Sequence, residues 1–268
     1  MLMIPIFNKI LKTVTIIAKQ LNFKSYVKQK GRKLALTIEQ ILTAGIFKQQ
    51  QGIATKKSTY EILNIKTKCS YKTFAVSLNR FAHLAAIILA LIMKTNQGIS
   101  GTIKILDSTC VPVCQLKNSK KHKVMQGLAD YGKTGNGAYF GLKLHICATP
   151  LKRILSLKFT SGNTDDRKVV IGLTKELEGL FLADAGYISK KLAALFNQEN
   201  KRMLFAKPRK NMKKLITEFQ DKLYKVRSLV EINFRILKQF CGFITSLPKS
   251  ADGYLANYIY SLLAYQIF

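Results

Sequence analysis

A change in residue pattern near Gly98-Ile-Ser-Gly101 constrains the fold of this chain more than any other feature. Before it, apolar residues recur at the spacing of an α-helix, as in residues 7–21 and 73–93. After it, short runs rich in β-branched residues alternate with helical stretches. The pattern predicts a helical region, residues 1–100, a glycine-containing linker, and an α/β region, residues 101–268.

The order of the elements in the second region is typical of an α/β layer fold. Three strands come first, and helices then alternate with two further strands. Residues 117–137 are expected to form a basic loop, and Thr37 is placed to cap a helix in the first region. Strands are expected at residues 102–107, 138–147, 154–159, 180–183 and 203–206, and helices at 165–177, 190–197, 217–240 and near the C-terminus.

The charge balance indicates a polyanionic partner. The chain has 44 Lys and Arg against 14 Asp and Glu, a net charge of +30, and its 48% hydrophobic residues exclude a disordered basic tail. Nucleic acid is the usual partner of such a chain. The longest apolar stretch, residues 81–93, is too short to span a bilayer, so no membrane association is expected. Five cysteines without metal-site spacing indicate free thiols in a reducing cytoplasm.

Because acids are scarce, the position of each one is informative. Asp107 falls inside an apolar, β-branched strand, where aspartate is disfavoured and a buried carboxylate needs a partner or a metal. Asp184 follows the carboxyl end of another apolar strand, where the sites of open α/β sheets form. Glu231 stands among cations on the long helix expected at residues 217–240.

The long helix carries a polar stripe. Tyr224, Glu231 and Lys238 are seven residues apart, so each lies within about 20° of the last around the axis. Arg227 is four residues before Glu231 and joins the stripe. On helix geometry alone, a solvated face with ion pairs is the favoured explanation of this pattern. A carboxylate held among cations at a site is the alternative.

Three carboxylates from two strands and a helix can hold two Mg²⁺ (or Mn²⁺) ions, which prefer hard oxygen ligands. Such a pair of ions activates a water or a 3′-hydroxyl and stabilises the leaving oxygen of an in-line phosphodiester displacement. The surrounding lysines and arginines would hold the substrate phosphates without reading bases. This hypothesis connects the positions of the acids with the basic composition.

A series of motifs in order resembles the insertion-sequence DDE transposases, which have an RNase H-like catalytic core. Tyr224-x2-Arg227-x3-Glu231-x6-Lys238 matches the family's Y-R-E-K signature at all four positions. Blocks around Asp107, at residues 140–145, at residues 161–167 and at residues 183–187 also match. The set most resembles the nine-eighty-two family of insertion sequences.

The resemblance implies a fold and a site. The fold would be a mixed five-stranded sheet flanked by helices, preceded by a helical domain that binds DNA ends. Asp107, Asp184 and Glu231 would be the catalytic, metal-binding acids, and Arg227, Lys238 and Tyr224 would contact DNA or flank the acids. The activity would be cleavage at the ends of the transposon followed by strand transfer, on double-stranded DNA, by a homodimer or a larger assembly.

Two other motifs are judged on their context. Gly127-x4-Gly132-Lys133-Thr134 matches a P-loop formally, but it lacks a buried strand before it and a helix after it. Asp165 and Asp166 precede a helix, so they are expected to cap it. Two rival functions stay open: a nucleic-acid-binding protein without chemistry, which includes an inactive transposase copy, and another RNase H-like nuclease.

Overall fold

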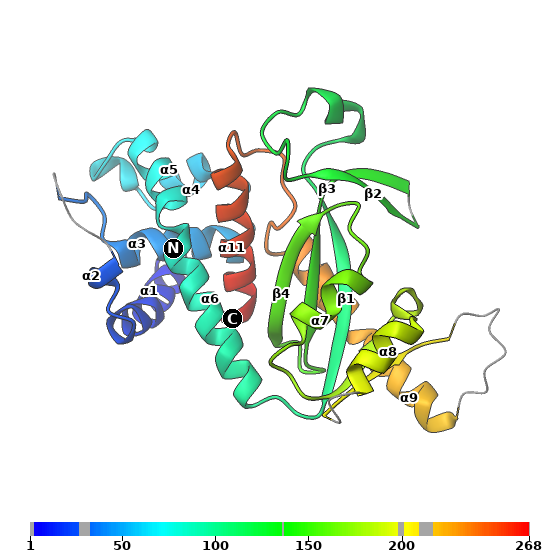
Figure 1. The fold of residues 1–268 in the computed structure, drawn as a ribbon. Coiled ribbons are helices and arrows are strands. Elements are labelled where there is room, and N and C mark those ends of the chain that lie inside the picture. The colour runs from blue at the N-terminus through cyan, green and yellow to red at the C-terminus, as the bar shows by residue number, and fades with distance from the viewer. Residues whose placement is uncertain (1–2, 27–32, 136, 198–200, 209–216, 268) are drawn as a thin grey trace. The chain divides into compact units, whose positions relative to one another are not determined.

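The chain forms two compact units in a computed structural model that describes residues 3–26, 33–135, 137–197, 201–208 and 217–267 (Figure 1). The helical unit combines Met1–Leu91 with Ile236–Phe268, and the α/β unit is Ile92–Arg235. The chain therefore passes between the units twice. Within the described residues the helical elements before the sheet are α1 (Met3–Gln20), α2 (Phe23–Tyr26), α3 (Ile38–Gln50), α4 (Lys56–Ile62), η1 (Ile65–Thr67), α5 (Tyr71–Arg80) and α6 (Ala82–Gly98).

Helix α3 is the centre of the helical unit. Thr37 caps it, as the sequence predicts: its side chain accepts from the backbone N–H of Gln40, whose side chain accepts from Thr37 in return. Almost every residue of α3 is buried, because α1, α5 and the C-terminal helix α11 (Ala251–Ile267) all pack against it. A Cβ at Gly45 would lie 2.4 Å from the ring of Tyr260, so glycine is required for this close approach.

The apolar stretch after residue 70 forms two helices instead of the single helix expected at residues 73–93. Phe81 separates α5 from α6, with a ψ of 5° that departs from helical geometry. By length and composition alone Tyr71–Gly98 would suffice to cross a membrane, but buried helices of globular proteins satisfy the same test. Phe74, Leu78 and Phe81 are fully buried here. The expectation of no membrane association stays a prediction.

A mixed sheet forms the α/β unit, and it includes all five strands expected from the sequence. Strand β1 is antiparallel to β3 and parallel to β5; β3 is antiparallel to β4, and β5 is parallel to β6. A sixth strand, β2, pairs with the first part of β3. The strands are β1 (Ile103–Pro112), β2 (Asp130–Thr134), β3 (Gly137–Ala148), β4 (Ile154–Ser161), β5 (Gly179–Ala183) and β6 (Arg202–Ala206).

The prediction of a basic loop at residues 117–137 is wrong over part of its length. The segment includes most of the short helix η2 (Leu116–Lys121) and all of β2. The ring of Tyr131 packs 5.1 Å from that of Phe140 on β3, and its hydroxyl donates to Ser119 Oγ at 2.9 Å. These contacts hold β2 on the sheet. The last three residues of the P-loop-like motif are therefore part of a strand and form no phosphate loop.

Helices α7 (Arg167–Leu173) and α8 (Lys190–Asn197) cover one face of the sheet and lie in front of it in Figure 1. They bury an apolar cluster that includes Leu106 and Phe181. Because successive side chains of a strand point to opposite faces, Asp107 points away from this cluster. Gly179 starts β5 with a φ of +106°, where a Cβ would lie 2.3 Å from the carbonyl of Thr102. Glycine thus allows β5 to begin close beside β1.

The long helix expected at residues 217–240 is divided in the structure. Helix α9 (Glu218–Arg227) ends at Ser228, and α10 (Leu229–Gln239) follows directly. The break is slight, because Ser228 keeps right-handed helical dihedrals and the N–H of Glu231 donates to its carbonyl at 3.1 Å. Arg227 and Glu231 therefore remain neighbours across it.

Candidate active site

Asp107 lies in β1, and Asp184 directly follows the adjacent parallel strand β5 at the same level. The register pairs Ile105 of β1 with Leu182 of β5, and each aspartate stands two residues farther along. Asp184 directly follows β5 and precedes the short helix η3 (Ala185–Tyr187). Because residues two apart point to the same face of a strand, both carboxylates belong to the face opposite α7 and α8. The structure brings these two predicted residues together.

Arg227 connects Asp107 with Glu231. Its Nη1 lies 2.9 Å from Oδ2 of Asp107, and its Nη2 lies 3.1 Å from Oε1 of Glu231. The side chains of Arg227 and Asp107 are 18% and 17% exposed, whereas that of Glu231 is 59% exposed. A guanidinium fork can hold two carboxylates in this way because its donors are fixed in one plane. The predicted third acid thus reaches the first through a cation.

The pKa of Asp107 is raised to about 6, chiefly because burial disfavours its charged form. The guanidinium of Arg227 and the backbone N–H of Ser108, which donates to Oδ1 at 2.8 Å, act in the opposite direction. The charges of Asp184 and Glu231 raise the pKa further. The charges of both other acids therefore act on Asp107, and a further cation near Asp107 would stabilise its ionised form.

Tyr187 is a site neighbour that the sequence did not single out. Its side chain is buried, it hydrogen-bonds with Ser108, and its pKa is raised by burial and by the charges of Asp166, Asp107 and Asp184. It stands three residues after Asp184, and Ser108 directly follows Asp107. In the sequence, the only indication of this role was that Ser108 and Tyr187 belong to the two matching blocks that contain Asp107 and Asp184. The hydrogen bond connects the segments that carry the two aspartates.

The donor chemistry suits a divalent metal, but the geometry described here is not that of a metal site. Asp107, Asp184 and Glu231 supply hard carboxylate oxygens, as Mg²⁺ or Mn²⁺ requires. Within the described residues, however, no three His, Cys, Asp or Glu side chains lie close enough together to hold an ion. The guanidinium of Arg227 stands between two of the three acids. The three acids therefore supply suitable donor types, and binding one ion would require them to come closer together than they are in this structure.

The other two residues of the Y-R-E-K signature are placed differently. Tyr224 is buried, stacks on Phe205 with 5.0 Å between ring centroids, and donates its hydroxyl to the carbonyl of Ala206 at 3.0 Å. It thus fixes α9 to β6. Lys238 stands in the last turn of α10, in the part of that helix that belongs to the helical unit. A DNA contact by either residue stays a prediction.

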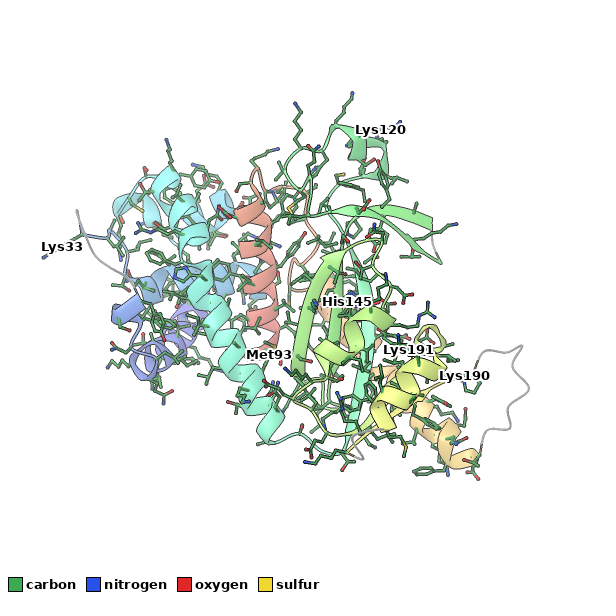
Figure 2. All side chains as sticks on the ribbon, viewed as in Figure 1. Lys33, Met93, Lys120, His145, Lys190 and Lys191 are labelled. Atoms are coloured by element: carbon green, nitrogen blue, oxygen red, sulfur yellow. The ribbon has the colours of Figure 1, made fainter. Side chains whose placement is uncertain are left out.

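A second polar cluster lies on the opposite face of β3, around the buried His145 (Figure 2). Asp166 Oδ1 lies 3.2 Å from Nζ of Lys143 and 3.4 Å from Nδ1 of His145. Burial lowers the pKa of His145 to about 4, outweighing the attraction of Asp166. The prediction that Asp166 caps α7 is wrong. Asp166 makes no capping hydrogen bond, because its carboxylate is directed at this cluster. Asp165 does accept from the backbone N–H of Arg167, so the capping prediction is confirmed there.

Exposed lysines are spread over the α/β unit. Figure 2 labels Lys120 on η2 and Lys190 and Lys191 at the start of α8, and all three are exposed. Lysines at several separate elements suit an extended anionic partner, because such a partner can contact many cations at once. The basic composition therefore has a counterpart on the surface of this unit.

Comparison with known proteins shows similarity to transposases. The family model described as "Transposase DDE domain" matches residues 97–246. No curated protein matches the chain. Among solved structures, the piggyBac transposase synaptic complex with hairpin DNA matches at a TM-score of 0.51 and 10% identity, over 98% of this chain and 70% of that one. The Mos1 mariner paired end complex with Mn matches at a TM-score of 0.26 and 11% identity, over 87% and 88% of the two chains. The first likeness concerns the fold alone, and the second is too distant to carry an argument.

Proposed function

The chain belongs to the Transposase DDE domain family, whose model matches more than half of its length, and we propose that it is the transposase of an insertion sequence. It has the RNase H-like core of DDE transposases. In this proposal it cleaves at the ends of the element and joins the freed 3′ ends to target DNA. The observation that carries the proposal is that Asp107 in β1 and Asp184 directly after β5 lie at the same level of the sheet, with Glu231 connected to Asp107 through Arg227. The motif set supports the nine-eighty-two family of insertion sequences.

Asp107, Asp184 and Glu231 would together hold divalent metal ions, which DDE transposases generally use. We propose two Mg²⁺ or Mn²⁺ ions, which when bound activate a water or a 3′-hydroxyl and stabilise the leaving oxygen of an in-line displacement. The protein contributes a rigid base for two of the carboxylates, because β1 and β5 are paired inside the sheet. Tyr187 reinforces that base through Ser108.

Arg227 has two roles in this proposal. Without metal ions it neutralises Asp107 and Glu231, which would otherwise repel each other. With the carboxylates neutralised by metal ions, the guanidinium is free to bind a phosphate oxygen of the DNA, for which its fork is well suited. The same residue would thus serve the resting site and the loaded one.

The DNA itself would be held by charge distributed over the chain. A net charge of +30 suits a partner with one phosphate per strand every few ångströms. The helical unit would bind the transposon ends, and Lys238 would contact DNA or support the acid site. Because both ends of an element must be held together, we propose that two or more copies assemble on the DNA.

A second candidate function is DNA binding without chemistry. The observation that favours it is the Arg227 bridge, together with the lack of a three-acid metal cluster among the described residues. In such a protein the bridge would be permanent, and the basic surface would still bind DNA. The two functions differ in whether the acids are needed for cleavage.

A nicking assay distinguishes these functions. The full chain is incubated with Mg²⁺ and a duplex that contains the inverted repeats flanking its coding region. We expect Mg²⁺-dependent nicks at the repeat ends, a loss of at least about 100-fold in rate for Asp107→Asn, Asp184→Asn and Glu231→Gln, and unchanged duplex affinity. Asp221→Asn is the matched control, because Asp221 forms an ion pair at the surface of α9 with Lys225.

The outcomes are distinct. Nicking that persists in any one of the three variants refutes the assignment of that residue. No nicking by the parent chain on any repeat-containing duplex, with DNA binding retained, favours the protein without chemistry. Cleavage of an RNA–DNA hybrid without any joining indicates another RNase H-like nuclease.

A further inference from the structure

The helical unit contains a large cavity that no step of the proposed chemistry uses. Its volume is about 820 Å³, and α3, α4, α5, the segment before α11 and α11 itself contribute to its wall. All of these elements belong to the helical unit. Five lysines line the cavity and, among the described residues that line it, no acid does: Lys48, Lys56, Lys57, Lys72 and Lys249.

Lys48 is the most unusual of these lysines because it is almost completely buried. It is 8% exposed, and its Nζ lies 3.3 Å from Oε1 of Gln49, a neutral acceptor. Gln49 is itself held in place, since its amide donates to Oδ1 of Asn257 at 2.6 Å. Burial lowers the pKa of Lys48 to about 8, and the charge of Lys56 adds to the effect. The fold thus keeps an ammonium group at a wall whose described lining residues include no carboxylate to balance it.

Lys56 places a second cation close to the first. Its ammonium donates to Oδ1 of Asn79, another neutral acceptor, and burial lowers its pKa as well. Two cations that share a cavity without an acid between them repel each other and are expensive to bury. Such an arrangement is expected where a bound anion supplies the missing charge.

The remaining wall suits the parts of a nucleotide that surround a phosphate. Lys57, whose charge is paired with Glu61 at 3.4 Å, stands over the ring of Tyr71, which lines the cavity, at 5.4 Å from its centroid. Val76 and Leu247 also line the cavity and are 56% and 54% exposed, so they offer apolar contact area to a sugar or a base. The combination favours a phosphate that is part of a nucleic-acid strand.

We propose that this cavity is a phosphate-binding site of the helical unit, in which Lys48 and Lys56 hold a backbone phosphate of bound DNA. The inference rests on the proposed transposase function, because that function supplies the DNA. It assigns the anchoring of DNA in this unit to the buried Lys48 and the half-buried Lys56, whereas a general basic surface would use exposed lysines.

The test compares the variant Lys48→Met/Lys56→Gln with the control variant Lys12→Gln/Lys66→Gln in the full chain. Both variants lose two positive charges from the helical unit, but Lys12 and Lys66 are exposed and do not line the cavity. Duplex affinity is measured by fluorescence anisotropy at several salt concentrations. We expect the cavity variant to lose about tenfold in affinity and about one unit in the slope of log K against log salt, with less change in the control.

Two further readouts separate a binding role from a structural one. The melting temperature of the cavity variant should equal or exceed that of the parent, because an unbalanced buried cation has been removed. Inorganic phosphate should raise the melting temperature of the parent but not that of the cavity variant. A further outcome is that phosphate raises the melting temperature of the parent only, while the cavity variant keeps the duplex affinity of the parent. That result would support the site and assign it to free phosphate instead of DNA phosphate.

Equal duplex affinity and equal phosphate response in the two variants would overturn this inference. A parent chain that binds and nicks DNA under those conditions would leave the proposed function intact. A parent chain that binds no duplex at any salt concentration would refute both proposals together.

Discussion

Arg227 Nη1 lies 2.9 Å from Oδ2 of Asp107, a residue 120 positions earlier in the chain. The same guanidinium reaches Glu231 with Nη2, so one cation is shared by two predicted metal ligands. A metal ion and this guanidinium would be attracted to the same oxygens. Competition between the two follows from this geometry.

Replacing Arg227 should therefore strengthen metal binding in the absence of DNA. We expect Arg227→Gln to raise the affinity for Mn²⁺ about five- to tenfold, because a nearby positive charge is lost. Isothermal titration with Mn²⁺ measures this directly. Arg235→Gln is the matched control, since Arg235 lies four residues beyond Glu231 and is exposed. Unchanged or weaker Mn²⁺ binding by Arg227→Gln would contradict the competition.

Asp107→Asn should stabilise the fold at neutral pH. The folded pKa of about 6 lies above the ordinary value of 3.8, so the stability that Asp107 contributes is present below pH 3.8 and is lost as the pH rises through about 6. We expect the variant to gain about 1–3 kcal/mol in free energy of unfolding at pH 7 and nothing near pH 3.5. Urea unfolding at the two pH values measures the gain, and a loss at pH 7 would contradict the assignment of burial as the dominant cause.

His145 should make the protein sensitive to acid. Its folded pKa of about 4 lies below the ordinary 6.5, so the stability of the neutral form is present above pH 6.5 and is lost as the pH falls toward 4. Asp166 opposes this loss, whereas Lys143 and Lys158 increase it. We expect parent and His145→Gln to differ in the pH dependence of unfolding by about 1–3 kcal/mol across that window. Parallel curves for the two proteins would show that His145 does not titrate in this way.

Lys48 should affect stability at the alkaline end. Its folded pKa of about 8 lies below the ordinary 10.5, so the cost of its burial is complete below pH 8 and is relieved as the pH rises toward 10.5. The parent should therefore gain up to about 3 kcal/mol relative to Lys48→Met between pH 7 and pH 10.5. Denaturant unfolding of both proteins across this range is the measurement. A constant difference would mean that Lys48 keeps its ordinary pKa.

Local patterns predicted those parts of the fold that depend on neighbouring residues. The strand around Asp107 and the strand before Asp184 were recognisable, because aspartate is unusual in or directly after an apolar β-branched run. Thr37 was recognisable as a cap because a cap is also a local feature: its partner Gln40 is only three residues away. The sequence could also place Arg227 beside Glu231, because four residues make one helical turn.

Contacts between distant segments were not predictable in this way. Strand β2 depends on Tyr131 packing against Phe140, in a stretch whose lysines and glycines indicate a loop. The redirection of Asp166 from its helix to His145 depends on which face of β3 is covered by α7. Nothing in the spacing of Gly45 indicates that Tyr260, far along the chain, will occupy the space beside it.

The helical unit is built from both ends of the chain, with α11 packed on α3. During synthesis on the ribosome, α3 emerges long before α11. The apolar surface of α3 that packs against α11 therefore stays uncovered by that helix until about 200 further residues have been translated. The sheet can form during that interval, since domains fold as units while the chain is still growing. Completion of the helical unit, and with it the lysine-lined cavity, therefore follows the synthesis of α11, so a nascent chain lacks the proposed phosphate site until α11 has been made.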